Sequence, residues 1–219
     1  YTNWNNQFLG FDMGHVTPNE TIIDYLLENK ICGLARGKAE FGPRALGNRS
    51  LLADPRGDDI KDKVNAIKQR QQFRPFAPVI LEEMADQYFD FSSGWTDSRY
   101  MQSVAHCRYR DQFPAICHVD GTSRVQTVPN DGSGIRQLLE RWYERTGCPM
   151  LLNTSLNVRG EPMVNNRDDA DRFEAIIKAI KQIKAMPNSK IPEAKLPIRK
   201  YFIPASLLRM SFFLLPAKM

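Results

Sequence analysis

The sequence has few of the residues that build metal sites and disulfide frameworks. Its 219 residues include 4 cysteines and 3 histidines. The cysteines, Cys32, Cys107, Cys117 and Cys148, form no C-x-x-C pair, and no zinc-ligand spacing is present. We therefore expect no transition metal in this chain, and reduced thiols in a cytoplasmic protein.

Long hydrophobic runs are missing as well. The longest uninterrupted apolar run, residues 212–215, is far shorter than the roughly 18 residues that a membrane-spanning helix needs. No signal segment opens the chain, and its first residue is Tyr1 rather than Met, which predicts a fragment without its N-terminal part. The sequence thus predicts no membrane contact.

Positive charge is concentrated in two regions. The net charge is +5, with 42% apolar and 25% charged residues, as in ordinary soluble globular proteins. Residues 172–219 hold 10 basic and 2 acidic residues, and residues 35–74 hold 10 basic and 5 acidic residues within an otherwise acidic body. A short basic segment of this kind favours a small anionic ligand over a long polyanion.

Helical and strand patterns alternate along the chain. Thr17-Pro18-Asn19-Glu20 predicts a helix start with Thr17 as the N-cap and Pro18 at the first helical position. Further helices are expected at 58–70, 82–88, 134–146 and 173–186, and strands at 31–34, 77–81, 104–109, 123–128 and 150–153. This alternation predicts an α/β domain. We assign it to residues 17–186, between a connector (1–16) and a basic tail (187–219) that five prolines interrupt.

Two basic segments have the composition of an anion site. Residues 37–50 follow a predicted strand and mix glycines with Arg44 and Arg49, so that backbone amides and guanidinium groups could bind phosphate. The alternative is a surface turn with solvated charges. In residues 68–78, Lys68 and Arg70 could simply interact with the helix dipole. Arg74 lies before Pro75, where a cation beside an apolar strand needs a partner.

Two further segments that carry polar side chains lie in a predicted strand or at the end of one. In residues 118–128, strand alternation places Arg124, Gln126 and Val128 on one face. His118 and Asp120 could act in acid–base chemistry, although a hydrogen-bonded turn is the better interpretation. Residues 152–157 put short polar side chains after a buried strand, where α/β sheets bind ligands.

These four segments, in this order, resemble the C-terminal domain of the carbamoyltransferases that modify nodulation factors and antibiotics. The matching strings are GKAEFGPRALGNRSLLADPR, KQRQQFRPFAPVILEE, HVDGTSRVQTV and LLNTSLNVRGEP. The resemblance covers residues 29–169 and implies a YrdC-like fold, a twisted mixed sheet with flanking helices and a basic concavity. Departures are Leu156 and Ser123, where the family has Phe and Ala, and a divergent C-terminus.

The resemblance also implies a reaction. In this family the domain converts carbamoyl phosphate and ATP, bound with Mg²⁺, into carbamoyl adenylate, and a Kae1-like N-terminal domain, absent here, transfers the carbamoyl group to a hydroxyl or amine. It implies catalytic roles for Arg74, Arg124 and Ser155. It implies binding roles for five further residues, which are Lys68, Arg44, Arg49, Asn153 and Thr154.

Two other interpretations remain open. The chain could be an RNA- or nucleotide-binding module without catalysis, or a fragment that only docks on its Kae1-like partner. Single-strand binders stack bases on exposed aromatic rings. Because we expect Phe41, Phe73 and Phe76 to lie in the core, nucleic-acid binding is the less favoured alternative.

Overall fold

The computed structural model describes residues 12–13, 17–92, 94 and 96–185, with side chains described as far as residue 177. Nearly all of the predicted connector 1–16 and the whole predicted tail 187–219 lie outside the described residues. Within the described part of the chain, no helix is long and apolar enough to cross a membrane.

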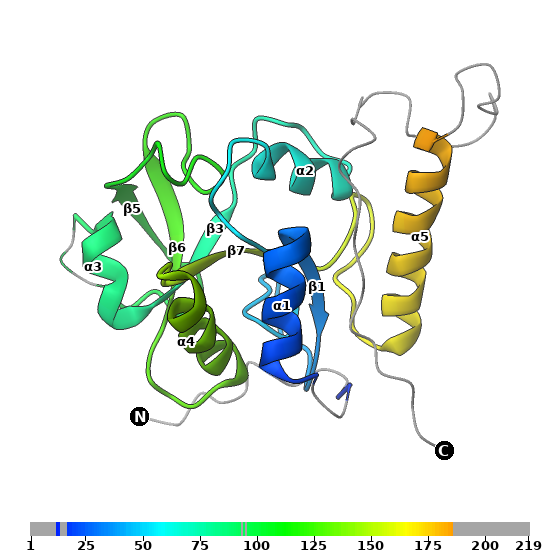
Figure 1. Ribbon diagram of the computed structural model, residues 1–219, viewed down its shortest axis with the longest axis horizontal. Coiled ribbons are helices and arrows are strands. Elements are labelled where there is room, and N and C mark those ends of the chain that lie inside the picture. Colours follow the sequence, from blue (N-terminus) through cyan, green and yellow to red (C-terminus); the bar gives the residue numbers. More distant parts are fainter. Residues whose placement is uncertain (1–11, 14–16, 93, 95, 186–219) are drawn as a thin grey trace.

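A seven-stranded mixed sheet forms the centre of the domain (Figure 1), with the strand order β1-β2-β7-β3-β6-β5-β4. The strands are β1 Ile31–Ala35, β2 Arg49–Ala53, β3 Ala77–Leu81, β4 Phe89–Asp90, β5 Ser103–Cys107, β6 Thr122–Val128 and β7 Met150–Ser155. Only the pair β3–β6 is parallel, and the other neighbours are antiparallel. The predicted α/β class with a mixed sheet is confirmed.

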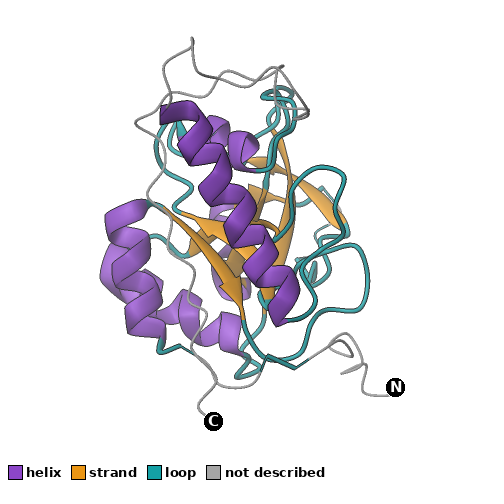
Figure 2. Cartoon of the chain, turned by 90° about the vertical axis from the view of Figure 1, so that its right-hand side faces the viewer, coloured by secondary structure: helices purple, strands orange, loops and turns teal. Residues whose placement is uncertain are grey.

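Helices cover both faces of this sheet (Figure 2). They are α1 Asn19–Asn29, α2 Ile60–Ile67, the 3₁₀ turn η2 Glu82–Met84, α3 Ala85–Tyr88, α4 Gly134–Thr146 and α5 Arg167–Ala185. The apolar sides of α1 and α4 share one hydrophobic cluster with Leu52, Val79 and Leu151 of the sheet. Helices α2 and α5 share the other cluster with Leu51 and Leu152. Alternate residues of β2 and β7 therefore belong to opposite cores.

The start of α1 differs from the sequence prediction. Pro18 rather than Thr17 is the N-cap, and no side chain caps the first turn. Ile22, Ile23 and Leu26 form the buried stripe of this helix. Burial of this stripe against α4 and the sheet fixes the helix, so a missing cap bond of roughly 1 kcal/mol does not decide whether it forms.

Two strands have no counterpart in the prediction. Strand β2 directly follows the basic loop, and β4 is only two residues long. Strand β2 has too few buried apolar residues for its sequence to show the two-residue period of a strand. Its pairing with β1 and β7 makes it a strand. Helix α2 ends at Ile67 instead of Arg70, and α5 begins at Arg167 instead of Phe173.

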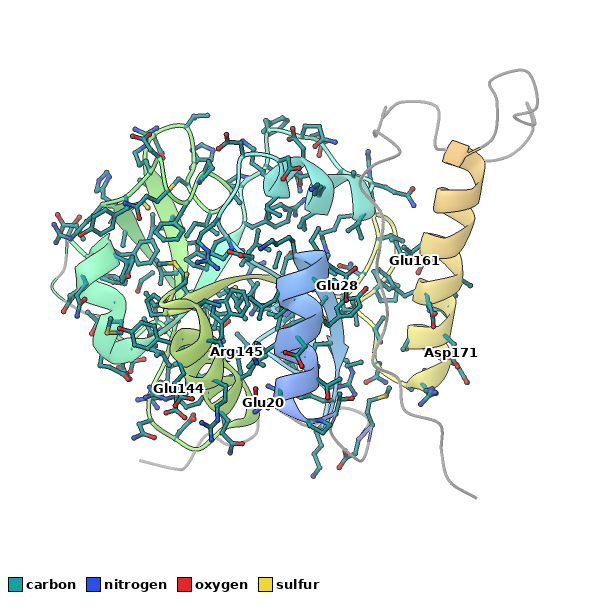
Figure 3. The ribbon with its side chains drawn as sticks, in the orientation of Figure 1. Glu20, Glu28, Glu144, Arg145, Glu161 and Asp171 are labelled. Atoms are coloured by element: carbon teal, nitrogen blue, oxygen red, sulfur yellow. The ribbon has the colours of Figure 1, made fainter. Side chains whose placement is uncertain are left out.

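Helices α1 and α4 are also linked by exposed ion pairs (Figure 3). Arg145 of α4 contacts Glu20 at 3.3 Å and Asp24 at 3.1 Å, and both acids belong to α1. Such exposed pairs contribute little free energy each. They place the charged side of α4 in an ion-pair network with α1.

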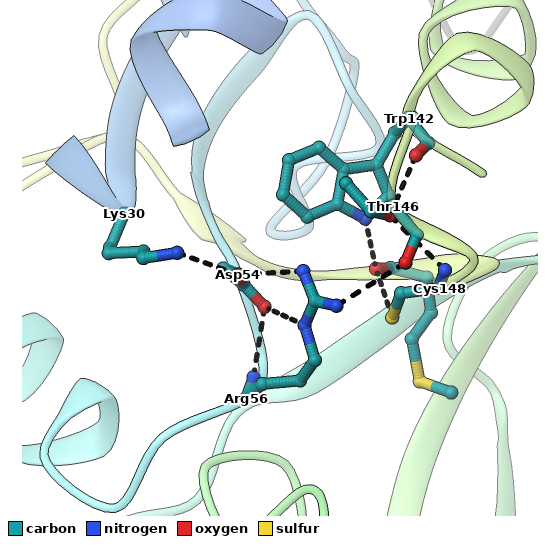
Figure 4. Close-up of polar contacts among 7 residues, drawn as sticks. Lys30, Asp54, Arg56, Trp142, Thr146 and Cys148 are labelled. Carbon is teal, nitrogen blue, oxygen red and sulfur yellow. Dashed lines mark hydrogen bonds and ion pairs between the residues drawn. The ribbon is translucent and has the colours of Figure 1, made fainter. Parts of the chain in front are cut away.

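A buried carboxylate, that of Asp54, directly follows β2. Asp54 is 2% exposed and forms ion pairs with Arg56 at 2.8 Å and with Lys30 at 3.4 Å (Figure 4). Arg56 also lies 5.7 Å above the ring of Trp142 and donates to the Thr146 carbonyl. A buried carboxylate needs such cations because its own desolvation is unfavourable. These contacts hold the end of β2 against α4.

Candidate anion-binding site

The basic loop between β1 and β2 is organised by one buried carboxylate. Glu40 is 6% exposed, and its Oε1 accepts the amides of Leu46 and Asn48 at 2.7 Å and of Arg49 at 3.3 Å. Three donors on one oxygen satisfy amides that a glycine-containing loop would otherwise leave free. The loop is thus a fixed structure rather than a solvated turn.

Two amide side chains attach this loop to the sheet. Asn153 of β7 donates its Nδ2 to the Ala45 carbonyl at 3.0 Å and to Gln126 Oε1 at 2.7 Å. Gln126 of β6 donates in turn to the Leu46 carbonyl at 3.2 Å. Asn153 is 1% exposed, and its Oδ1 has no hydrogen-bond partner among the described residues. Asn153 therefore positions the loop through its Nδ2.

Four arginines from three segments lie within electrostatic range of one another. Burial, and then the charges of Arg74 and Arg124, lower the pKa of Arg70 to about 10. Burial, and then the charge of Arg44, lower the pKa of Arg124. These residues come from the loop after β1, the segment before β3, and β6. The structure thus brings together Arg44, Arg74 and Arg124, which the sequence pattern had singled out separately.

Three of these guanidinium groups have no counter-ion in the part of the chain that the structure describes. Among the described residues, no hydrogen bond or ion pair joins the side chain of Arg44, Arg74 or Arg124 to another group. Asp120, the acid that could have neutralised Arg124, instead accepts from Thr122 at 2.7 Å and lies 3.3 Å from His118 Nδ1. Uncompensated guanidinium groups that repel one another are suited to a phosphate. The His118–Asp120 contact confirms the predicted turn.

Arg70 and Asn65 hold the segment that carries Arg74 in place through hydrogen bonds. The Nε of Arg70 donates to Asn65 Oδ1 at 2.7 Å, and its guanidinium lies 4.2 Å from the centre of the Phe76 ring. Asn65 is buried and donates to the carbonyls of Gln72 and Arg74 at 3.1 and 3.0 Å. Arg70 thus has a role beyond the interaction with the helix dipole that the sequence suggests. The sequence contains one signal of this arrangement, because Asn65 is a polar residue on the buried side of the predicted helix 58–70.

Lys68 and Ser155 form a second polar group. The buried Nζ of Lys68 contacts the Ser155 carbonyl, Ser155 Oγ at 3.2 Å, and the carbonyl and Oδ1 of Asn157 at 3.1 and 2.8 Å. Burial, and then the charge of Arg70, lower the pKa of Lys68 to about 7. The surrounding oxygens favour the ammonium form, which opposes the effect of burial. Both residues are thus held in place before any ligand binds.

Arg49 and Thr154 are placed differently from the arginine cluster. Arg49 is fully buried, and its guanidinium donates to the carbonyls of Arg36, Gly37 and Asn165. A ligand would have to displace these bonds. Thr154 points away from Asn153 and Ser155 because neighbouring strand residues face opposite sides. Ligand-binding roles for Arg49 and Thr154 stay predictions.

The aromatic residues of the basic segments are not all in the core. Phe41 is 77% exposed and Phe73 is 69% exposed, whereas Phe76 is 5% exposed. The prediction that all three are buried is therefore wrong for Phe41 and Phe73. Their apolar and proline neighbours in the sequence do not decide burial, because both residues lie in loops between helices and strands. Exposed rings thus lie next to Arg44 and Arg74 in the chain.

A separate cavity lies away from these arginines. Its volume is about 470 Å³, and it is lined by Asp58, Lys61, Arg110, Asp111, Pro114, Cys117, His118 and Val119. None of the eight predicted site residues lines it. Within the described residues, no group of three or more His, Cys, Asp or Glu side chains could hold a metal ion.

The seven-stranded sheet and its helices define an α/β domain that carries, among the described residues, a group of arginine side chains without counter-ions. By sequence, the chain belongs to the family described as carbamoyltransferase C-terminus, which matches residues 23–184. The resemblance found in the four motifs is thereby confirmed.

Curated relatives include nodulation proteins of several rhizobia. The chain is 43% identical to nodulation protein NolNO of Sinorhizobium fredii over 151 residues, which cover 67% of this chain and 22% of the relative. It is 42% identical to nodulation protein NolO of Bradyrhizobium diazoefficiens, with 67% and 28% covered. It is 44% identical to nodulation protein U of Azorhizobium caulinodans, with 57% and 22% covered. The chain thus spans about a quarter of the length of these relatives.

Proposed function

We propose that this domain binds ATP with Mg²⁺ together with carbamoyl phosphate and forms carbamoyl adenylate. In this proposal a Kae1-like domain then transfers the carbamoyl group to a hydroxyl or amine acceptor. The observation that carries the proposal is the set of three guanidinium groups, Arg44, Arg74 and Arg124, that have no partner among the described residues. The family described as carbamoyltransferase C-terminus supports the carbamoyl chemistry.

The chemistry needs charge compensation more than a nucleophile. Water first cleaves carbamoyl phosphate into carbamate and inorganic phosphate. A carbamate oxygen then attacks the α-phosphorus of ATP, the bond between the α-phosphorus and the bridging oxygen breaks, and pyrophosphate leaves. Guanidinium groups in fixed positions stabilise the negative charge that builds up on the phosphorus oxygens. In this proposal Arg74 and Arg124 hold the phosphate of the donor, and Lys68 and Ser155, which already contact each other, orient the nucleotide. Arg44 completes the cluster from the loop that Glu40 and Asn153 fix.

Replacing either Arg74 or Arg124 by Ala should weaken binding of carbamoyl phosphate by roughly ten- to a hundred-fold, because a charge-assisted hydrogen bond contributes about 1.5 to 3 kcal/mol. Lysine at either position should restore only part of the affinity, since it lacks the paired donors. Titration calorimetry with carbamoyl phosphate and ATP measures the affinities, and pyrophosphate release measures the reaction.

Arg141→Ala is the matched control. Arg141 is exposed on α4 and pairs with Glu144 at 2.7 Å, so the substitution removes the same charge away from the cluster. It should leave affinity and pyrophosphate release unchanged. Full activity of stable Arg74→Ala and Arg124→Ala proteins would contradict the proposed roles of these residues.

A second candidate, single-stranded RNA binding, is favoured by the exposure of Phe41 and Phe73. Each ring neighbours a cluster arginine in the sequence, and stacking on aromatic side chains contributes about 1 to 3 kcal/mol per base. Fluorescence anisotropy with a labelled oligoribonucleotide tests this function. It predicts that Phe41→Ala and Phe73→Ala weaken RNA binding while carbamoyl phosphate binding persists.

A further inference from the structure

Asn157 lies in the loop after β7 and contacts both members of the Lys68–Ser155 group. Its Oδ1 accepts from Ser155 Oγ at 2.7 Å and from Lys68 Nζ at 2.8 Å. Its Nδ2 donates to the Glu161 carbonyl at 2.8 Å. Since only the nitrogen of an amide side chain can donate to a carbonyl, this last contact fixes which end of the amide faces Ser155. Asn157 therefore presents an acceptor, and no donor, to Ser155.

These contacts fix the direction of the Ser155 hydroxyl proton. A serine hydroxyl has one proton and two lone pairs. The proton is donated to Asn157 Oδ1, and one lone pair accepts from the Lys68 ammonium group at 3.2 Å. The carbonyls of Ser155 and Asn157 also accept from Lys68 Nζ, which favours its ammonium form. Ser155 Oγ can therefore offer a ligand a lone pair but no proton.

Ser155 lies on the side of the sheet that carries the anion site. Alternate residues of a strand share a face, so Ser155 and Asn153 of β7 point to the same side. Asn153 is paired with Ala77 of β3, which follows Arg74 by three residues. Ser155 is half-buried, whereas Asn153 is 1% exposed. A ligand on this face can thus reach Ser155 Oγ.

We propose that Asn157 is a positioning residue for recognition of the carbamoyl group. It turns the Ser155 hydroxyl so that Oγ accepts a hydrogen bond from the NH₂ group of carbamoyl phosphate. This inference rests on the proposed function and adds a basis for its substrate specificity. Phosphate oxygens accept hydrogen bonds and suit the arginines, whereas the NH₂ group donates and suits Ser155. Carbamoyl adenylate keeps the same NH₂ group, so the contact persists in the product.

The contact distinguishes carbamoyl phosphate from acetyl phosphate, which has a methyl group in place of the NH₂ group. The two molecules have nearly the same shape and the same phosphate, so the arginines do not separate them. One hydrogen bond between neutral groups corresponds to a roughly two- to ten-fold difference in affinity. The wild-type chain should therefore bind carbamoyl phosphate more tightly than acetyl phosphate by about this factor.

Two substitutions of Asn157 separate orientation of the hydroxyl from a general structural role. Asn157→Asp keeps an oxygen acceptor for Ser155 and Lys68, whereas Asn157→Ala leaves the Ser155 hydroxyl free to turn. Both variants lose the donor to the Glu161 carbonyl, so a purely structural role of Asn157 would affect them alike. We expect Asn157→Asp to retain the preference for carbamoyl phosphate and Asn157→Ala to lose it. Ser155→Ala, which removes the acceptor itself, should lose the preference as well.

Titration calorimetry of the purified chain with carbamoyl phosphate, acetyl phosphate and ATP in separate runs measures these affinities, and thermal unfolding verifies that each variant folds. Equal affinity of wild-type protein for the two acyl phosphates would overturn the inference and leave the proposed function standing. Absence of carbamoyl phosphate binding to wild-type protein would overturn both. Because these two comparisons use wild-type protein, poor folding of a variant does not affect them.

The variants add two results that would overturn the inference. The first is loss of the preference in Asn157→Asp as well as in Asn157→Ala, which would assign Asn157 a structural role only. The second is an unchanged preference in Ser155→Ala together with weaker ATP binding, because Ser155 would then contact the nucleotide instead of the carbamoyl group.

Discussion

Arginine side chains in this protein differ in what surrounds them rather than in their local sequence. Arg49 is fully buried and donates to backbone carbonyls, whereas Arg136 is paired with Glu83 and Glu140 at 2.7 Å. Arg74 and Arg124 are exposed and have no such partners among the described residues. Only cations whose donors are not already used by the protein can bind an anion without first breaking other bonds.

Lys68 gives a pH-dependent prediction. Its pKa falls from an ordinary 10.5 to about 7 in the folded protein, mainly because of burial. Between these values the unfolded chain binds a proton that the folded protein does not, so this residue's contribution to stability should rise with pH. The unfavourable contribution is complete below the folded pKa and disappears above the unfolded one.

The measurement compares wild-type protein with Lys68→Met by urea unfolding. Relative to the variant, the free energy of unfolding of the wild type should increase by on the order of 1 kcal/mol between about pH 7 and about pH 9. Contacts with Ser155 and Asn157 limit the size of the effect because they favour the charged form. A difference that stays constant with pH would show that these contacts fully offset burial.

At the scale of elements, the loop between β1 and β2 depends on a close contact with α4. A Cβ atom added at Gly47 would lie 2.7 Å from Ile135 Cβ, and the residue has a φ of +125°. Gly42, in the same loop, has a φ of +126° with nothing within 4 Å of the added atom. The two glycines therefore share the strained backbone conformation but differ in space.

Gly47→Ala should destabilise the protein more than Gly42→Ala. The shared strain costs about 1 to 3 kcal/mol in both, and the collision with Ile135 adds about 1 to 3 kcal/mol in Gly47→Ala alone. Chemical denaturation of both variants measures the difference. Equal losses of stability would mean that the loop moves away from α4 without a penalty.

At the scale of the whole molecule, the described domain carries every candidate site residue, while the basic residues 187–219 lie outside the described part. The matching relatives are about four times longer than the aligned part of this chain. Transfer of a carbamoyl group to an acceptor is thus a proposal for the longer protein, and anion binding and adenylate formation are proposals for this domain.

Deleting residues 187–219 should leave affinity for ATP almost unchanged, because the arginine cluster lies within residues 44–124. Any RNA binding should become weaker and less sensitive to salt, since removal of cations reduces the release of counter-ions. Titration calorimetry and anisotropy at two salt concentrations check both expectations. Loss of ATP binding in a truncated protein that remains folded would place the deleted segment in the site.

The sequence by itself determined the α/β class, most helices and strands, and the four motifs that identify the family. These features follow from local periodicity and from residues that are close together in the chain. Strand β2, by contrast, exists through pairing with β1 and β7, which the sequence does not place next to it.

Only the tertiary structure decided which of those residues act together. It joined Arg70 to the arginine cluster and exposed Phe41 and Phe73. Burial and electrostatic interaction depend on distances between segments that are remote in the chain, and composition or spacing within one segment does not contain those distances. The physical reason is that the sheet order places β3 between β7 and β6, so that the segment before β3 and the residues of β6 and β7 become neighbours only after these strands have paired.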